Sequence, residues 1–417
     1  MARGSTEVAQ AVGAVIDAEL GISLAAAGMV RSIRVRRWRA EVVVALPIAA
    51  WPGRDDIAGR VATAAERALG HDAIPQVRSN GGSSTGEGSL RRALDVSVEM
   101  EVMDEAERTA LRGRLRHAME VGAPEGREDD RAEDREHEHG HEHGHEHGDA
   151  STPAFLRPGS GTRVVAVASG KGGVGKSSVT ANLAIALAQA GRRVGVLDAD
   201  VYGFSLPKML GASHDPVILG DLVVPTAVHG VRLLSMGFFV PDDQPVIWRG
   251  PMLHKAIQQF LTDAFWGQPD FLLVDMPPGT GDVTLSLAQV MPRAEVLVVT
   301  TPQPAAQRVA QRSAFAARKL KLSVRGVVEN MSWFTGDDGT RYELFGRGGG
   351  ATLAEDLGVP LLGQVPLVPA LREGGDDGVP VVVADPDGEA AGAFTALAER
   401  VERMGPARVY RRELVIR

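Results

Sequence analysis

One run of glycines and lysines has the spacing of a phosphate-binding loop. Residues 170–177 read Gly-Lys-Gly-Gly-Val-Gly-Lys-Ser, which fits the pattern G-x-x-x-x-G-K-[ST] and adds a lysine after the first glycine. Glycines let the backbone fold closely around phosphates and point its N–H groups at their oxygens. Lys176 would neutralise the β- and γ-phosphates, and Ser177 would bind Mg²⁺. We therefore expect a nucleoside triphosphate site made of Gly170, Lys171, Gly172, Gly173, Val174, Gly175, Lys176, Ser177 and Ser178.

Three acids are placed to serve the same site. Asp275 ends the apolar run Phe271–Val274, which is the position expected of the acid that orients Mg²⁺ through water. Asp198 and Asp200 follow another apolar run two residues apart, so both can face the metal and the γ-phosphate, with Asp200 positioning the attacking water. Gly279 could offer its backbone N–H to the γ-phosphate, so that hydrolysis would release the loop after it.

The elements that must hold these residues form an α/β pattern. The glycine loop follows the apolar run Val164–Val167 and precedes a segment with helical apolar spacing. Short runs that are apolar on both faces alternate with helical segments, which predicts a parallel sheet with helices on both faces and ligands at the carboxyl ends of its strands. The expected strands are 164–168, 194–197, 231–235, 271–275, 296–300, 324–328 and 361–365.

Four regions follow from composition. Residues 1–120 predict a small α+β domain, residues 121–161 a disordered charged linker, residues 162–405 the P-loop domain, and residues 406–417 a basic tail. Within the first region the patterns predict helices at 8–19, 55–69 and 105–119 and strands at 29–37, 40–46 and 94–103. The linker holds a tract, residues 136–147, in which six histidines alternate with acid or glycine. This tract is either a solvated spacer or a binder of Zn²⁺, Ni²⁺ or Cu²⁺.

Composition excludes several classes of protein. The net charge of -8 disfavours non-specific nucleic-acid binding, and the chain has neither an apolar stretch of about 18 residues nor the layout of a secretory signal. We therefore expect a cytoplasmic protein with no membrane span. The chain contains no cysteine, so it can form neither a disulfide nor a thiolate-held cluster.

Together these motifs resemble a known family, the Mrp/ApbC ATPases of the deviant P-loop group that includes the nitrogenase iron protein, MinD and ParA. The resemblance covers about residues 160–400. It is carried by the lysine-bearing loop, Asp198-Ala199-Asp200-Val201-Tyr202-Gly203, Arg249-Gly250-Pro251-Met252, Asp275-Met276-Pro277-Pro278-Gly279-Thr280-Gly281-Asp282, Glu329-Asn330-Met331-Ser332 and Phe345-Gly346-Arg347-Gly348-Gly349-Gly350.

The resemblance implies specific roles and a dimer. Lys171 would reach across a homodimer to the nucleotide of the other subunit, so that ATP joins the two copies and a second lysine assists Lys176, Asp200 and Asp275 in catalysis. Asn330 would recognise the adenine edge, and the segment around Pro366 would cover the base. The implied cofactors are ATP and Mg²⁺.

The resemblance also implies a role with iron–sulfur clusters, for which this sequence lacks the ligands. Family members are thought to hold a cluster between subunits with a Cys-x-x-Cys pair, where this chain reads Thr335-Gly336-Asp337-Asp338-Gly339. Asp337 and Asp338 are hard donors that suit Mg²⁺ or Ca²⁺, or they form an ordinary turn. Residues 17–21 and 28–30 resemble a small iron–sulfur-assembly domain, although Ala18 replaces its usual proline and its frequent cysteine near Trp51-Pro52 is missing.

Two classes of function remain open. The first is a homodimeric, Mg²⁺-dependent ATPase that supports iron–sulfur cluster assembly or delivery to recipient apoproteins, with the cluster held by a partner. The second is an ATP-gated scaffold of the MinD/ParA type, whose slow hydrolysis times association with a partner, a membrane or the nucleoid. For that class the basic tail would be either a surface-binding element or a solvated end.

Overall fold

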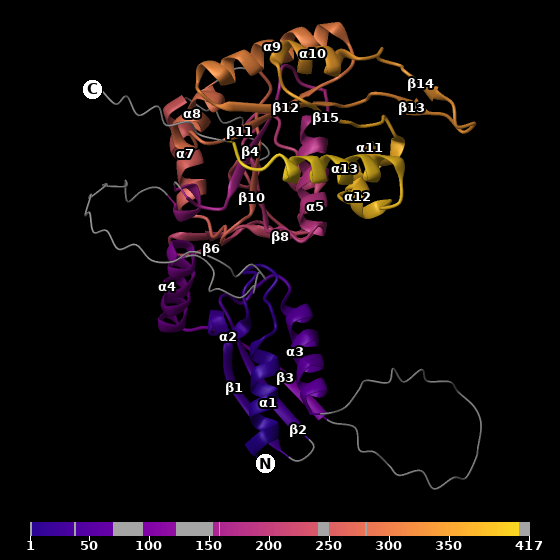
Figure 1. The fold of residues 1–417 in the computed structure, drawn as a ribbon. Coiled ribbons are helices and arrows are strands. Elements are labelled where there is room, and N and C mark those ends of the chain that lie inside the picture. The colour runs from indigo at the N-terminus through magenta and orange to yellow at the C-terminus, as the bar shows by residue number, and fades with distance from the viewer. Residues whose placement is uncertain are drawn as a thin grey trace, which may run out of the picture. The chain divides into compact units, whose positions relative to one another are not determined.

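A computed structural model describes residues 2–36, 39–69, 95–121, 153–157, 159–240, 250–279 and 282–407. It divides the chain into two compact units, Met1–Ala118 and Met119–Arg417 (Figure 1). The histidine tract, most of the expected linker, Arg249 and residues 408–417 of the expected tail lie outside the described residues. In the described part of the chain, no helix is long and apolar enough to cross a membrane.

The first unit is a three-stranded sheet with helices packed on one of its faces. The strand order is β1-β2-β3, with β2 antiparallel to β1 and parallel to β3. Val42 and Val44 of β2 are buried on the helix-covered face because alternate residues of a strand point to opposite sides. The elements are α1 (Ala2–Gly13), α2 (Leu24–Ala27), β1 (Val30–Arg36), β2 (Arg39–Leu46), α3 (Arg54–Ala68), β3 (Asp95–Val102) and α4 (Glu105–Val121), whose last residues fall in the second unit.

The first helix differs from the one that the sequence predicts. It ends at Gly13 rather than continuing to residue 19. After it the chain turns around the buried carboxylate of Asp17, which accepts hydrogen bonds from the Leu20 amide (2.8 Å) and the Trp51 indole (2.9 Å). Burial raises the pKa of Asp17, against these hydrogen bonds. The chain after Gly13 therefore forms a turn around Asp17 and not another turn of the helix.

The second unit is built on an eight-stranded sheet of order β15-β12-β11-β4-β10-β5-β9-β8. Its elements are β4 (Arg163–Ser169), α5 (Lys176–Gln189), β5 (Val194–Asp198), α6 (Leu206–Met209), β6 (Val217–Leu219), β7 (Leu222–Val224), β8 (Thr226–Val228), β9 (Val231–Ser235), α7 (Gly250–Thr262), β10 (Phe271–Asp275), α8 (Asp282–Val290), β11 (Glu295–Thr300), α9 (Pro304–Lys319), β12 (Ser323–Glu329), β13 (Phe334–Thr335), β14 (Arg341–Tyr342), α10 (Gly349–Leu357), β15 (Leu361–Gln364), α11 (Pro369–Asp377), α12 (Val381–Ala384) and α13 (Glu389–Arg403), with short 3₁₀ turns at Ala154–Leu156 and Met236–Phe239.

Helices cover both faces of this sheet, as the apolar strands predict (Figure 1). Successive residues of β4 enter opposite cores: Val164 and Ala166 pack with α7, α8, α9 and α10, whereas Val165 and Val167 pack with α5, α12 and α13. This arrangement confirms the predicted α/β class. The seven predicted strands all run parallel to their neighbours in the sheet. The short edge strand β8, which the sequence did not predict, is added antiparallel to β9.

The last helix, α13, is fastened at its C-terminal end. It packs along α5, the helix that follows the glycine loop. The guanidinium of Arg163 donates to the Val401 carbonyl (2.6 Å), and that of Arg325 donates to the carbonyls of Met404 (3.1 Å) and Gly405 (3.0 Å). Cationic donors at helix carbonyls satisfy groups that would otherwise be unpaired and complement the helix dipole.

Candidate nucleotide-binding site

The predicted phosphate loop connects β4, in the middle of the sheet, to the first residue of α5. Gly173 and Gly175 have φ angles of 77° and 78°, which side chains rarely adopt. A Cβ on Gly175 would lie 2.1 Å from Nδ2 of Asn330. Because α5 begins at Lys176, its free N–H groups face the loop. The local structure is thus a backbone cradle for an anion, and only glycine fits at its closest approach.

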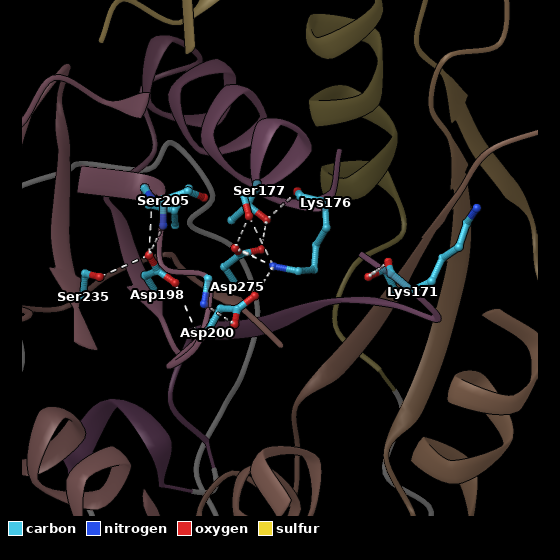
Figure 2. Close-up of polar contacts among 12 residues, drawn as sticks. Lys171, Lys176, Ser177, Asp198, Asp200, Ser205, Ser235 and Asp275 are labelled. Carbon is cyan, nitrogen blue, oxygen red and sulfur yellow. Dashed lines mark hydrogen bonds and ion pairs between the residues drawn. The ribbon is translucent and has the colours of Figure 1, made fainter. Parts of the chain in front are cut away.

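Lys176 is buried beneath this loop and is paired with acids (Figure 2). Its ammonium lies 2.6 Å from Oδ2 of Asp275 and 3.9 Å from Oδ2 of Asp200. Asp275 is fully buried at the end of β10, so its negative charge needs a nearby cation. Lys176 is that cation, and it neutralises the buried carboxylate.

Two hydroxyl groups complete the surroundings of Asp275. Ser177 Oγ donates to Oδ2 (2.6 Å), and Thr180 Oγ1 donates to Oδ1 (2.8 Å). Thr180 also bonds the Lys176 carbonyl at 3.0 Å, one helical turn back. The two hydroxyls, presented by the first turns of α5, orient both carboxylate oxygens. Thr180 was not predicted from the sequence, although it lies one helical turn after Lys176 on the face that must meet the loop.

The two acids after β5 do not face the site together. Asp200 lines the cavity, and its Oδ1 accepts from the Gly203 amide (3.1 Å). Asp198 is fully buried and does not line it. The Asp198 carboxylate accepts four hydrogen bonds, from the amides of Asp200, Ser205 and Leu206 (3.2 Å each) and from Ser235 Oγ (3.1 Å).

This geometry differs from the expectation that Asp198 would face Mg²⁺, because its four donors fix the start of α6 and the end of β9 (Figure 2). Burial, and then the charge of Asp275, raise the pKa of Asp198 to about 7. Burial also raises the pKa of Asp200, against the opposing effect of Lys176. The contacts of Ser205 and Ser235 with Asp198 were not predicted from the sequence, in which they lie 7 and 37 residues from it.

Lys171 lies apart from this cluster. Its side chain is exposed and points away from Lys176 and Asp275 (Figure 2). Its carbonyl accepts a hydrogen bond from Ser169 Oγ (3.0 Å), which holds the backbone of the loop while leaving the ammonium in solvent. Lys171 and Lys176 therefore belong to one loop, but their side chains point in different directions (Figure 2).

Gly279 is engaged in this arrangement. Its N–H donates to the Ser169 carbonyl (2.9 Å) and its own carbonyl accepts from Ser313 Oγ (3.1 Å). The amide expected to meet a γ-phosphate is thus committed to the end of β4. Gly279 would have to break this bond before it could contact a phosphate.

Asn330 contacts the loop, and Pro366 lies on the segment that is hydrogen-bonded to the residues after Asn330. Asn330 is buried, its Nδ2 donates to the Val174 carbonyl (2.9 Å), and its Oδ1 has no hydrogen-bond partner among the described residues. Pro366 is buried, and the residues on either side of it bond to the segment after Asn330: the Val365 carbonyl accepts from the Ser332 amide, and the Leu367 amide donates to the Trp333 carbonyl. An unpaired buried acceptor is costly unless a ligand donates to it.

Residues 335–339, which stand at the position of the family's cysteine pair, lie in the hairpin β13–β14. Asp338 accepts from the Thr340 amide (3.0 Å) and hydroxyl (2.8 Å), which lower its pKa. Glu389, at the start of α13, accepts from Trp333 (2.9 Å), Thr335 (2.9 Å) and Arg341 (2.8 Å). Across the described residues, no group of three or more His, Asp or Glu side chains could hold a metal.

A cavity of about 630 Å³ opens at the loop. Its polar wall is the loop with Asp200, and its apolar wall includes Met209, Leu253, Pro277 and Val283. A volume of this order suits a nucleotide-sized ligand. The glycine cradle and Lys176 suit the phosphates of a nucleotide, whereas Asn330 and Pro366 do not line this cavity.

Comparisons with known proteins give consistent findings. Residues 161–402 match the family model described as NUBPL iron-transfer P-loop NTPase, and residues 5–75 match the model of an iron–sulfur cluster assembly protein. The iron–sulfur cluster carrier protein of Mycobacterium leprae (strain TN) is 41% identical over 385 residues, which cover 90% of this chain and 87% of that protein.

The protein of the same description from Mycobacterium tuberculosis (strain ATCC 25618 / H37Rv) is 42% identical over 386 residues, with 90% and 87% covered. Among solved structures, the nucleotide-binding protein of Archaeoglobus fulgidus in complex with ADP is 32% identical and has a TM-score of 0.48. That match covers 56% of this chain and 93% of the other.

Proposed function

This chain belongs to the family of NUBPL-type iron-transfer P-loop NTPases, and from that premise we propose that it is a Mg²⁺-dependent ATPase that works as a homodimer in iron–sulfur cluster delivery. One observation carries the ATPase proposal: Lys176 lies under a glycine cradle, 2.6 Å from Asp275, with the Ser177 hydroxyl on the same carboxylate. These are the parts that phosphoryl transfer requires, brought together at one strand end.

The residues would exchange partners when ATP binds. Lys176 would leave Asp275 and turn to the phosphates, while Ser177 and the freed Asp275 would hold Mg²⁺ directly or through water. Bound Mg²⁺ supplies positive charge where the phosphate oxygens gain negative charge. Asp200, at the cavity wall, would position the attacking water. Asn330 would accept a hydrogen bond from the adenine amino group, with Pro366 beside it.

The homodimer proposal is supported by Lys171. An ammonium that is exposed and directed away from its own site can act on a nucleotide in a second copy, where it would stabilise transition-state charge. Two copies would then be joined through ATP.

The iron–sulfur cluster is treated as cargo, because this chain offers no thiolate to hold it. The sequence has no cysteine, and the hairpin at the corresponding position offers only carboxylates, one of which already bonds Thr340. Iron in clusters is bound by sulfur and occasionally imidazole ligands. We therefore propose that a partner or recipient apoprotein supplies the ligands, while this chain supplies ATP-dependent association.

Calorimetric titration of the full chain with Mg²⁺-ATP tests the ATPase site. Lys176→Ala should abolish detectable binding, because the main cation facing the phosphates is lost, whereas Lys319→Ala, at the exposed end of α9, should bind as wild type does. Lys176→Ala leaves buried acids unpaired, which costs about 3–5 kcal/mol of stability. The double variant Lys176→Met/Asp275→Asn removes both charges and should fold without binding. Wild-type affinity in either Lys176 variant would refute the proposed site.

A further inference from the structure

The first unit has a sheet face with an uneven distribution of charge. α1 and α3 pack on the face that carries Val42 and Val44. The opposite face presents Arg34 of β1, Glu41 and Val43 of β2, and Glu99 of β3, which line a shallow groove of about 460 Å³. Alternation along each strand places these side chains on one side.

Positive charge gathers at one edge of this open face and negative charge at the other. β1 contributes Arg31, Arg34 and Arg36, whereas β3 contributes Glu99 and Glu101. On the central strand, Arg39 and Glu41 lie 3.6 Å apart and balance each other.

Part of this charge is already paired within the unit. Arg31 bonds Glu101 and also Glu107 of α4. Arg34, Arg36 and Glu99 form no ion pair with any residue that the structure describes. Among the residues of this face that form no ion pair, those of edge strand β1 are basic and that of edge strand β3 is acidic. The central strand β2 between them has no net charge.

We propose that this open face binds the same face of a second copy of the chain, about a two-fold axis that runs parallel to the strands over β2. Such an axis exchanges left and right, so it lays the basic β1 of each copy over the acidic β3 of the other. An axis perpendicular to the strands in the same plane would instead oppose β1 to β1. Charge alone thus selects one of the two isologous arrangements.

This pairing rests on the proposed ATP-linked homodimer. Three strands about 4.8 Å apart and seven residues long cover roughly 330 Å² per copy, well below the roughly 800 Å² that a stable interface buries on each partner. Exposed ion pairs also contribute little individually. Once ATP joins two copies, however, the second contact becomes intramolecular, and its effective concentration can reach the millimolar range.

The absence of cysteine makes a direct test possible. In the full-length chain, Val43→Cys introduces the only thiol. Because Val43 lies on the central strand, this thiol would be next to the two-fold axis and close to the same thiol of the second copy. We expect a short bifunctional maleimide to cross-link Val43→Cys in the presence of Mg²⁺-ATP. The control, Arg67→Cys on α3, lies behind the sheet and should cross-link at least tenfold less.

Charge reversal in the Val43→Cys background tests the symmetry. Arg34→Glu/Arg36→Glu reverses the charge of β1 at these positions, and Ser97→Lys/Glu99→Lys places two positive charges in the middle of β3. Each variant alone then opposes like charges at these positions and should lose the cross-link. An equimolar mixture should regain it, because the acidic face of one variant then meets the basic face of the other. Recovery in the mixture also shows that both variants are folded.

Sedimentation with Mg²⁺-ATP separates this inference from the proposed function. A doubled mass with no cross-link at Val43→Cys would overturn the face pairing and leave the homodimer standing. The mass of a single copy would refute the homodimer. If the cross-link were also missing under the same conditions, the face pairing would be overturned as well. A cross-link that survives both charge reversals would also overturn it, since a partner face without these charges would then suffice.

Discussion

The ammonium of Lys176 is paired with the carboxylate of Asp275, and this pair is the central feature of the site. Its two charges are 2.6 Å apart and buried, so neither can be left alone at low cost. In the proposed exchange, ATP would offer Lys176 phosphate oxygens while Mg²⁺ offers Asp275 a cation. Nucleotide without metal would leave Asp275 unpaired, so the proposed Mg²⁺ dependence follows from this exchange.

Thr180 gives a prediction at the same scale. Thr180→Val keeps the shape of the side chain but removes the hydroxyl that donates to Asp275 Oδ1 at 2.8 Å. We expect ATP turnover to fall about tenfold, because a hydrogen bond to a charged group is worth about 1.5–3 kcal/mol, and half-saturation to require more Mg²⁺. Thr180→Ser keeps the hydroxyl and should behave like wild type. Identical Mg²⁺ titrations for Val and Ser variants would contradict a positioning role.

Asp198 gives a prediction about pH. Its folded pKa of about 7 lies above the ordinary value of 3.8, so between these values the folded state binds more protons than the unfolded state. The contribution of Asp198 to stability is present at low pH and is lost as pH rises from about 4 to about 7. Chemical unfolding of nucleotide-free protein should show that decline, and Asp198→Asn should reduce its slope. Parallel curves for the two proteins would disprove this origin.

Residues adjacent in sequence could be predicted, and residues that meet only through folding could not. The spacing of 170–177 is itself the phosphate loop, and Asp275 follows a strand that is plain from its four apolar residues. Ser235 reaches Asp198 across 37 residues, and only the pairing of β5 with β9 brings them together. The reuse of Lys176 as a counter-ion depends on burial, which spacing does not encode.

At the scale of elements, the hairpin β13–β14 depends on one carboxylate of a helix. Glu389 joins Trp333, Thr335 and Arg341 to the start of α13, and the Arg341 guanidinium lies 4.5 Å from the centre of the Trp333 ring. Burial raises the pKa of Glu389, but these donors together lower it. A hairpin with two-residue strands has little stability of its own, so its order comes from this anchor.

Glu389→Ala should therefore loosen the hairpin alone. We expect amide hydrogen exchange in residues 334–342 to accelerate about tenfold or more, since charged hydrogen bonds contribute about 1.5–3 kcal/mol each. The P-loop and its ATP affinity should not change. Glu399→Ala on the same helix breaks only an exposed pair with Arg403 and serves as control. Unchanged exchange in the hairpin of Glu389→Ala would mean that the strands hold themselves together.

The long strands of the second unit were predictable because a buried parallel strand is a continuous apolar run. Val194–Asp198 and Phe271–Asp275 show this, since both are buried along their whole length. The hairpin β6–β7 and the edge strand β8 are only three residues each, too short for a period to emerge. Tertiary contacts decide such pieces, and the sequence alone predicts them poorly.

For the whole molecule, we expect a substitution of Lys171 to separate ATP binding from dimerisation. Lys171→Ala should keep the ATP affinity of wild type, because its ammonium points away from its own site, but should reduce ATP-dependent dimerisation and turnover by at least tenfold. Sedimentation velocity and steady-state hydrolysis measure these effects, with Lys319→Ala as the matched lysine control. Full dimer formation by Lys171→Ala would show that the two copies meet without it.

A chain without cysteine also narrows what the whole molecule can contribute to cluster chemistry. Any thiolate ligand of a cluster would have to come from outside this chain. In the proposed function, the hairpin β13–β14 would therefore supply no thiolate.

α13 links distant parts of the second unit. At its N-terminal end, Glu389 is hydrogen-bonded to the hairpin. At its C-terminal end, Arg163 and Arg325 donate to backbone carbonyls, and between the two ends the helix packs against α5. Because α13 is held at both ends, it cannot slide freely along α5. If α5 shifts when the phosphate loop closes on a phosphate, α13 would transmit that movement to the hairpin, which lies about the length of this 15-residue helix from Arg163 and Arg325.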